Sequence, residues 1–158
     1  MDDELELNRV AVQARFTEDG YAERIGARLI AWGGGWSRVE LIVDDEYANF
    51  VGLLHGGVTF GLGDVAFAAA SNSWGRLSVA LSVDVQFLGT APSAAVLIAT
   101  ARERHRTKRT GAYLIEVRSR SKLDGEEALI RSLHALAHRT DRWTLGTEAW
   151  SDAWRAAH

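Results

Sequence analysis

The chain has no cysteine and only one proline, Pro92. The lack of cysteine excludes disulfides, thiolate zinc sites and cysteine nucleophiles, and it is compatible with the reducing cytoplasm, where we expect the protein to reside. The N-terminal residues Met1 to Glu6 are mostly acidic, whereas a secretory signal starts basic and then turns apolar. We therefore expect no signal peptide.

Neither an excess of positive charge nor a long apolar run is present. Lys and Arg number 18 against 21 Asp and Glu, which gives a net charge of -3 and argues against a nucleic-acid partner. The longest weakly polar stretch, 56–75, is interrupted by Gly, Ser and Asn and contains Asp64, so we expect no membrane span. The length of 158 residues, 47% of them hydrophobic, favours one domain with its own core.

The expected elements are a short helix over 4–16, two strands, an apolar helix over 56–74, and four further strands. The strand-like runs are 27–32, 36–43, 79–87, 96–103, 113–119 and 128–137. One sheet must then wrap a single central helix, which predicts an α+β fold with antiparallel pairing. We expect residues 1–139 to form this domain and 140–158 to form an aromatic tail docked on it.

Asp64 is the most informative residue, because it is the only charged side chain between His55 and Arg76 and lies in an apolar helix. An unpaired buried carboxylate is costly, and Asp is a poor helix former. Such a group is tolerated when it faces a partner, a cavity or a reaction. A structural Asp bonded to a neighbouring strand explains the pattern equally well.

His55-Gly56-Gly57 begins the same helix, where backbone N–H groups have no helical acceptor. Such donors can hold a developing oxyanion, although the motif alone is more typical of a tight turn that leads into a helix. Gly57 and Asp64 lie on one helical face but roughly 10 Å apart along the axis. If both serve one reaction, they must come from two copies of the chain, and we therefore expect a dimer with two equivalent sites.

The remaining candidates are weaker signals. Asn49 precedes the HGG turn and Ser82 lies on the polar face of its strand, and each alone is typical of a turn residue or a bonded hydroxyl. The basic segment 102–109 surrounds a turn, where it is either solvated or in contact with an anionic ligand. We find no metal motif, nucleophile-elbow serine or phosphate-cradling glycine loop.

The segments LHGGVTFGLGDVAFAAASNSWG, VALSVDVQFL and RTGAYLIEVRS resemble the phenylacetic-acid-degradation (PaaI-type) thioesterases of the hotdog-fold superfamily. The resemblance covers about residues 27–139. It implies a hotdog fold, a homodimer that commonly pairs into a homotetramer, and hydrolysis of acyl-CoA without a metal or other cofactor. The acyl group stays open between aryl-acetyl and short or medium aliphatic chains. Candidates for lining its pocket are Phe60, Phe67, Asn72 and Trp74.

The resemblance also implies roles for residues. Asp64 matches the carboxylate that acts as nucleophile or as general base on water, and the Gly57 N–H matches the donor to the thioester carbonyl. His55, Asn49 and Ser82 fall at places near the reaction centre. We assign contacts with coenzyme A to a separate set of residues. These are Gly56, Arg106, Lys108, Arg109, Thr110 and Gly111.

Two alternatives remain beside the thioesterase. Hotdog hydratases use a histidine on an Asp-x-Asn-Pro-x-His-like loop, and this chain has no such loop. A non-catalytic acyl-CoA binding or sensing module would bind the thioester without turnover, but it would have little use for Asp64. Gly89-Thr90 and Ser93-Ala94 depart from the Arg-Pro and Gly-Asp common in relatives, which affects the expected loop shape only.

Overall fold

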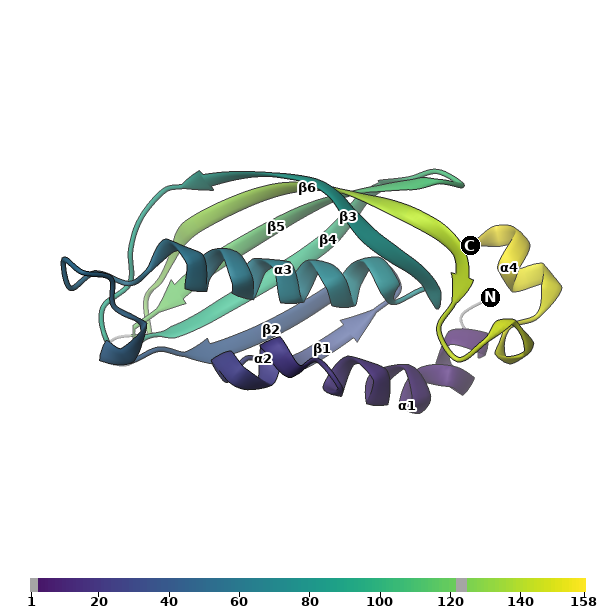
Figure 1. The fold of residues 1–158 in the computed structure, drawn as a ribbon, viewed down its shortest axis with the longest axis horizontal. Coiled ribbons are helices and arrows are strands. Elements are labelled where there is room, and N and C mark those ends of the chain that lie inside the picture. The colour runs from purple at the N-terminus through teal and green to yellow at the C-terminus, as the bar shows by residue number, and fades with distance from the viewer. Residues whose placement is uncertain (1–2, 122–124) are drawn as a thin grey trace.

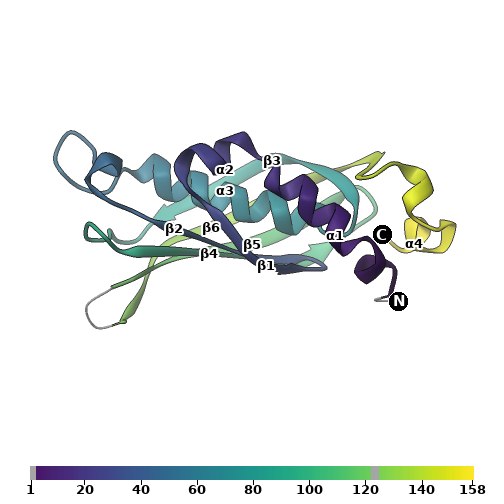
Figure 2. The same cartoon turned by 90° about the horizontal axis from the view of Figure 1, so that it is seen from below.

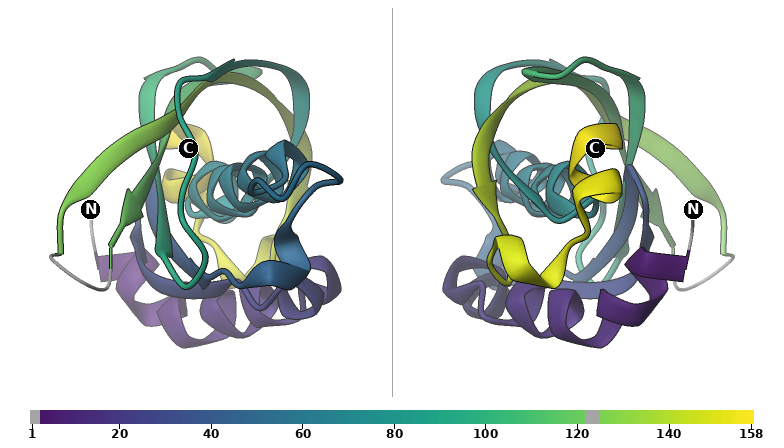
Figure 3. Two further views of the ribbon diagram at one scale, coloured as in Figure 1. Left: turned by 90° about the vertical axis from the view of Figure 1, so that its left-hand side faces the viewer. Right: turned by 90° about the vertical axis from the view of Figure 1, so that its right-hand side faces the viewer.

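In the computed structural model, which describes residues 3–121 and 125–158, a curved six-stranded sheet wraps around one central helix (Figures 1 and 3). The helices are α1 (Asp3–Thr17), α2 (Gly20–Ile25), α3 (Gly56–Asn72) and α4 (Asp152–Ala157), with 3-10 turns η1 (Asp45–Tyr47) and η2 (Thr147–Ala149). The strands are β1 (Arg28–Gly33), β2 (Trp36–Ile42), β3 (Arg76–Phe87), β4 (Val96–Arg106), β5 (Thr110–Arg120) and β6 (Glu127–Trp143). The strand order is β1-β2-β4-β5-β6-β3 and every pair is antiparallel, which confirms the predicted fold class.

Helix α3 packs its buried face into the concave side of the sheet. The main core includes Leu62, Ala66, Phe67 and Ala70 of α3 and Val39, Leu97, Ile115 and Leu133 of the strands. Gly63 permits this close approach, because a Cβ there would lie 3.1 Å from Cδ2 of Leu133. A Cβ at Gly61 would collide with the Tyr21 hydroxyl, so this glycine lets α2 pack on α3.

A second, aromatic core joins α1 to the C-terminal segment at the end of the molecule where α3 terminates (Figures 1 and 2). Trp154 donates from Nε1 to the carbonyl oxygen of Trp74 at 3.0 Å and stacks on Trp150. Trp150 precedes α4, so of these two tryptophans only Trp154 lies in the helix. No described helix is long and apolar enough to cross a membrane.

Two surfaces of the single chain remain uncovered. Strand β3 forms one edge of the sheet, and Val79 and Leu81 on it are 55% and 56% exposed. On α3, Asp64 and Ala68 are also exposed. The apolar helix expected over 56–74 is therefore not covered on this face by the chain's own sheet, because one sheet covers only part of the helix.

Candidate active site

The start of α3 is capped by His55. The Gly57 N–H donates to Nδ1 of His55 at 2.9 Å, which gives this otherwise free helical donor an acceptor. The donor expected to polarise a carbonyl therefore already has a partner within its own chain. A bound carbonyl oxygen must replace Nδ1 or share the N–H with it.

Asn49 organises the loop that leads into this helix. Its Oδ1 accepts from the backbone N–H groups of Val51 and Leu53 at 3.0 and 3.1 Å. The Asn49 N–H donates to the Leu53 carbonyl oxygen at 2.7 Å, and Ala48 bridges to Leu54. Because Oδ1 of Asn49 already accepts two hydrogen bonds within the loop, Asn49 would contact a substrate through its Nδ2 donor.

Asp64 lies two turns further along α3, on the exposed face. Partial burial raises the pKa of its carboxyl above the ordinary 3.8, and the negative charge of Asp19 raises the pKa further. Both effects disfavour the charged form, which makes the carboxylate a better proton acceptor once it is ionised. The structure thus places a carboxylate with a raised pKa on the one open face of the central helix.

Ser82 lies on the exposed edge strand. The register pairs Ser82 with Leu136 of β6, directly after an irregularity at Leu81 that interrupts the ladder. Bulges of this kind redirect the neighbouring side chains and often lie beside active sites. Ser82 is accessible from solvent in the single chain.

One chain alone brings together only some of the predicted site residues. His55 contacts Gly57, but Asp64 lies seven residues along the same straight helix, roughly 10 Å away by helical rise. The open face of α3 and the open edge β3, which carries Ser82, are the surfaces through which a second copy can supply what is missing.

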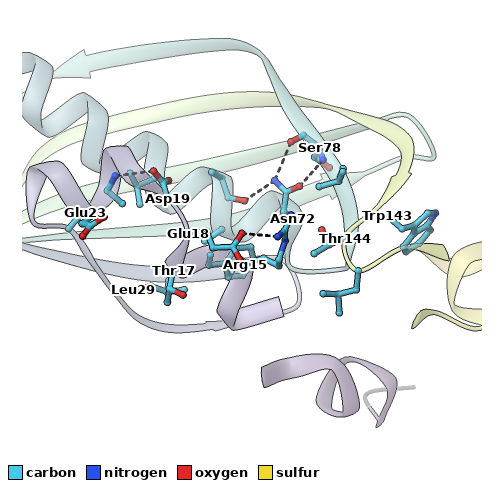
Figure 4. A pocket seen from close by; sticks show the side chains of 18 of the residues that line it. Arg15, Thr17, Glu18, Asp19, Glu23, Leu29, Asn72, Ser78, Trp143 and Thr144 are labelled. Atoms are coloured by element: carbon cyan, nitrogen blue, oxygen red, sulfur yellow. Dashed lines mark hydrogen bonds and ion pairs between the residues drawn. The ribbon is translucent and has the colours of Figure 1, made fainter. Parts of the chain in front are cut away.

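A cavity of about 1170 Å³ lies between α1–α2 and the C-terminal half of α3 (Figure 4). It is near Asp64, because its lining includes Val65, the next residue of α3, and Asp19, whose charge acts on Asp64. Val65, Ala68, Ala69 and Asn72 form its wall on α3. Asn72 is fixed there, because its Oδ1 accepts from the Ser78 N–H at 2.8 Å and its Nδ2 donates to the Ser78 carbonyl oxygen at 3.2 Å. The opposite wall includes Asp19, the cap of α2.

The sequence-based interpretation missed α2 and this wall, although Asp19-Gly20 was a readable capping signal. Of the four residues proposed as pocket lining, only Asn72 lines this cavity. Phe67 packs against Tyr113 in the core, with ring centroids 5.3 Å apart, and Trp74 belongs to the aromatic cluster of the tail.

The proposed coenzyme A residues divide between the β4–β5 hairpin and the start of α3. Arg106 is held in place, with Nε 3.4 Å from a Glu103 carboxylate oxygen and its guanidinium carbon 4.4 Å from the Trp74 ring centroid. Lys108 and Arg109 are exposed at the turn, whereas Thr110 and Gly111 already belong to β5 rather than to the turn. Gly56 is the first residue of α3. Within 3–121 and 125–158, no group of three or more His, Asp or Glu is arranged to hold a metal.

Comparison with known proteins identifies the family of the chain. Residues 51–125 match the Thioesterase superfamily. The chain is 36% identical over 104 residues to the acyl-coenzyme A thioesterase PaaI of Escherichia coli K12, covering 66% of this chain and 74% of that protein. The structure of the E. coli PaaI protein matches with a TM-score of 0.76 at 29% identity, over 89% of this chain and 96% of the other. A variant of the phenylacetic acid degradation protein PaaI from Thermus thermophilus matches with a TM-score of 0.70 at 30% identity, over 77% and 100%.

Proposed function

Because the chain belongs to the PaaI-type thioesterases of the hotdog superfamily and is a thioester hydrolase, we propose that it converts an aryl-acetyl or short- or medium-chain acyl-CoA to the free acid and CoA. The observation that carries the proposal is Asp64. It is an exposed carboxylate with a raised pKa on the open face of α3, beside a cavity large enough for an acyl group.

The reaction needs a nucleophile and an oxyanion donor. Asp64 either attacks the thioester carbonyl, forming a mixed anhydride that water later hydrolyses, or removes a proton from the attacking water. In both routes the carbon–sulfur bond breaks, CoA leaves as a thiolate and takes up a proton, and the acyl group gains the oxygen of water. The Gly57 N–H of a second copy stabilises the charge that develops on the carbonyl oxygen.

Three further side chains support this reaction in the proposal. Nδ2 of Asn49 and the Ser82 hydroxyl orient the carbonyl or the water, and His55 sets the direction of the Gly57 N–H through its 2.9 Å contact. Lys108 and Arg109, exposed at the β4–β5 turn, offer cations for the phosphates of CoA. Arg106, Thr110, Gly111 and Gly56 complete that set.

The site requires a homodimer, and we expect two dimers to form a tetramer. We further propose that the protein acts in the cytoplasm, with phenylacetyl-CoA from phenylacetate degradation as the first substrate to test. The proposal includes no metal or other cofactor and no nucleic-acid or membrane partner.

The test is thiol release from phenylacetyl, hydroxyphenylacetyl, benzoyl, hexanoyl and acetyl thioesters of CoA. Asp64→Asn should lower kcat/KM by about 100-fold or more while the protein stays a folded oligomer, because the general base or nucleophile is lost. Glu23→Gln, which neutralises another carboxylate at the same cavity, should retain activity. Binding of these thioesters without any hydrolysis by the wild-type protein would instead support the non-catalytic module.

A further inference from the structure

We propose that Phe50 of a second copy closes the cavity beside Asp64 and thereby selects the acyl group. The inference rests on the proposed two-copy site and goes further, because it assigns a specificity-determining residue that acts across the dimer. It arises from a loop whose apolar side chains have no contact partner in their own chain's core.

The loop before α3 presents apolar side chains to water. Phe50 is 99% exposed, Val51 60% and Leu53 53%. Asn49 holds this loop in shape through its hydrogen bonds to Val51 and Leu53, and Gly52 supports the turn with a φ of 79°. A rigid loop that exposes three neighbouring apolar side chains is typical of a contact surface.

The antiparallel arrangement of two α3 helices determines where this loop lies. We place Gly57 of the second copy beside Asp64. Because the two α3 helices are antiparallel, residues after Asp64 then lie beside partner residues that come before Gly57. Val65, Ala68 and Asn72 therefore lie alongside the segment that precedes the partner's α3, which is the exposed loop. Figure 1 shows this loop projecting beyond the N-terminal end of α3, free to reach along a second helix.

The cavity has both the position and the size to receive the loop. Val65, Ala68 and Asn72, which lie alongside the partner's loop in this arrangement, belong to the α3 wall of the cavity together with Ala69. Phe16 and Leu77 add apolar surface to it. Its volume of about 1170 Å³ is slightly above the roughly 300–1,000 Å³ typical of small-molecule sites, so it has room for a side chain of a second copy beside an acyl group.

In this arrangement the Phe50 ring covers the acyl group opposite Ala68. The ring thereby limits the length of acyl chain that fits beside Asp64. The ring also excludes water from the side of the carbonyl that is not attacked. Removing the ring should enlarge the chamber, which favours longer acyl groups over phenylacetyl and leaves the short acetyl thioester least affected.

The first experiment compares Phe50→Ala with the wild type on phenylacetyl-, decanoyl- and acetyl-CoA. We expect the ratio of kcat/KM for decanoyl over phenylacetyl to rise by about tenfold, since small changes of a hydrophobic pocket alter selectivity by this order. Val10→Ala is the matched control, because Val10 is also an exposed apolar residue, at 83%, but lies on α1 and not in the cavity. The control should keep the wild-type ratio.

The second experiment tests action across the dimer with mixed oligomers. Phe50→Ala chains are co-expressed with an excess of Asp64→Asn chains, so that each surviving Asp64 meets a partner with an intact Phe50. We expect wild-type selectivity. Wild-type chains with an excess of the double variant Asp64→Asn/Phe50→Ala should show the altered selectivity, because each surviving Asp64 then meets Ala at position 50 of its partner.

Altered selectivity in the first mixture and wild-type selectivity in the second would place Phe50 in its own chain's site and overturn the proposal. So would a wild-type ratio for Phe50→Ala alone. These results differ from failure of the proposed function, which would appear as full activity of Asp64→Asn by itself.

Discussion

In the proposed mechanism, His55 and the substrate carbonyl oxygen compete for the N–H of Gly57. The Gly57 N–H donates to His55 Nδ1 at 2.9 Å, and a helix cap of this kind stabilises by about 1 kcal/mol. A donor to a developing oxyanion contributes about 3 kcal/mol in the transition state. The reaction therefore gains more from the Gly57 N–H than the cap loses. The cap keeps the donor oriented in the free enzyme at a small cost.

The acid limb of the pH profile should reveal Asp64. Burial raises the pKa of its carboxyl and the charge of Asp19 raises the pKa further, so the active carboxylate is lost as pH falls through a value above the ordinary 3.8. Asp19→Asn removes this charge and still caps α2, since Asn is as good a cap as Asp. The acid limb of kcat/KM should then move to lower pH. It should stay above the position expected for an ordinary Asp, because burial is the larger cause of the raised pKa and remains.

The control for this shift is Glu23→Gln, which removes a nearby carboxylate that does not raise the pKa of Asp64. Its acid limb should coincide with that of the wild type. An Asp19→Asn profile superimposable on the wild type, with the plateau also unchanged, would show that the two carboxylates do not interact in the active oligomer.

At the scale of elements, the C-terminal segment should contribute to stability through Trp154. This side chain is 4% exposed, donates to the Trp74 carbonyl oxygen and stacks against Trp150 and His158. Trp154→Ala should lower the free energy of unfolding by about 3–5 kcal/mol, because it leaves a cavity between the tail and the body. Urea denaturation measures the loss.

Trp154→Phe is the comparison variant, since it keeps an aromatic ring and loses the hydrogen bond, which costs about 1 kcal/mol. The cavity beside Asp64 is lined by residues before η2 and not by Trp154, so both variants should keep the wild-type acyl preference at low temperature. A changed preference would instead give the segment from η2 onward a part in the acyl site.

The pattern of apolar residues predicted the central helix and the six strands, because alternation and glycine-rich turns are local signals. It did not predict α2, a six-residue helix too short to show periodicity, although Asp19 caps it. It ended the last strand near Ala137, whereas β6 continues to Trp143 with Arg139 buried, since a charged residue in a strand does not indicate burial by itself.

The site was predictable to the extent that it depends on single residues with unusual surroundings. Asp64 stood out as a lone charge in an apolar helix, and its seven-residue separation from Gly57 predicts two copies if both residues serve one reaction. The cap between His55 and Gly57 and the charge of Asp19 near Asp64 depend on spatial contacts. Apolar residues on α3 also look alike whether they face the chain's own sheet or a second copy, so the sequence did not show that the face around Ala68 is exposed in the single chain.

At the scale of the whole molecule, the two edges of the sheet differ. Strand β1 is a six-residue edge, whereas β3 is a twelve-residue edge with Val79 and Leu81 exposed. A long apolar edge strand is a ready surface for pairing with another chain. The same edge carries Ser82 and lies beside the open face of α3, so pairing there would assemble the proposed site.

Val79→Lys should therefore separate the active oligomer. A lysine on an edge strand opposes pairing between chains, and burying its charge in the interface should raise the dimer dissociation constant by about tenfold or more. We expect more monomer in sedimentation velocity and a specific activity that falls on dilution and recovers on concentration. Ile30→Lys is the matched control, because Ile30 is 48% exposed on the opposite edge β1. A Val79→Lys monomer with full activity would contradict the two-copy site, because Gly57 and Asp64 of one α3 are too far apart to act on one carbonyl.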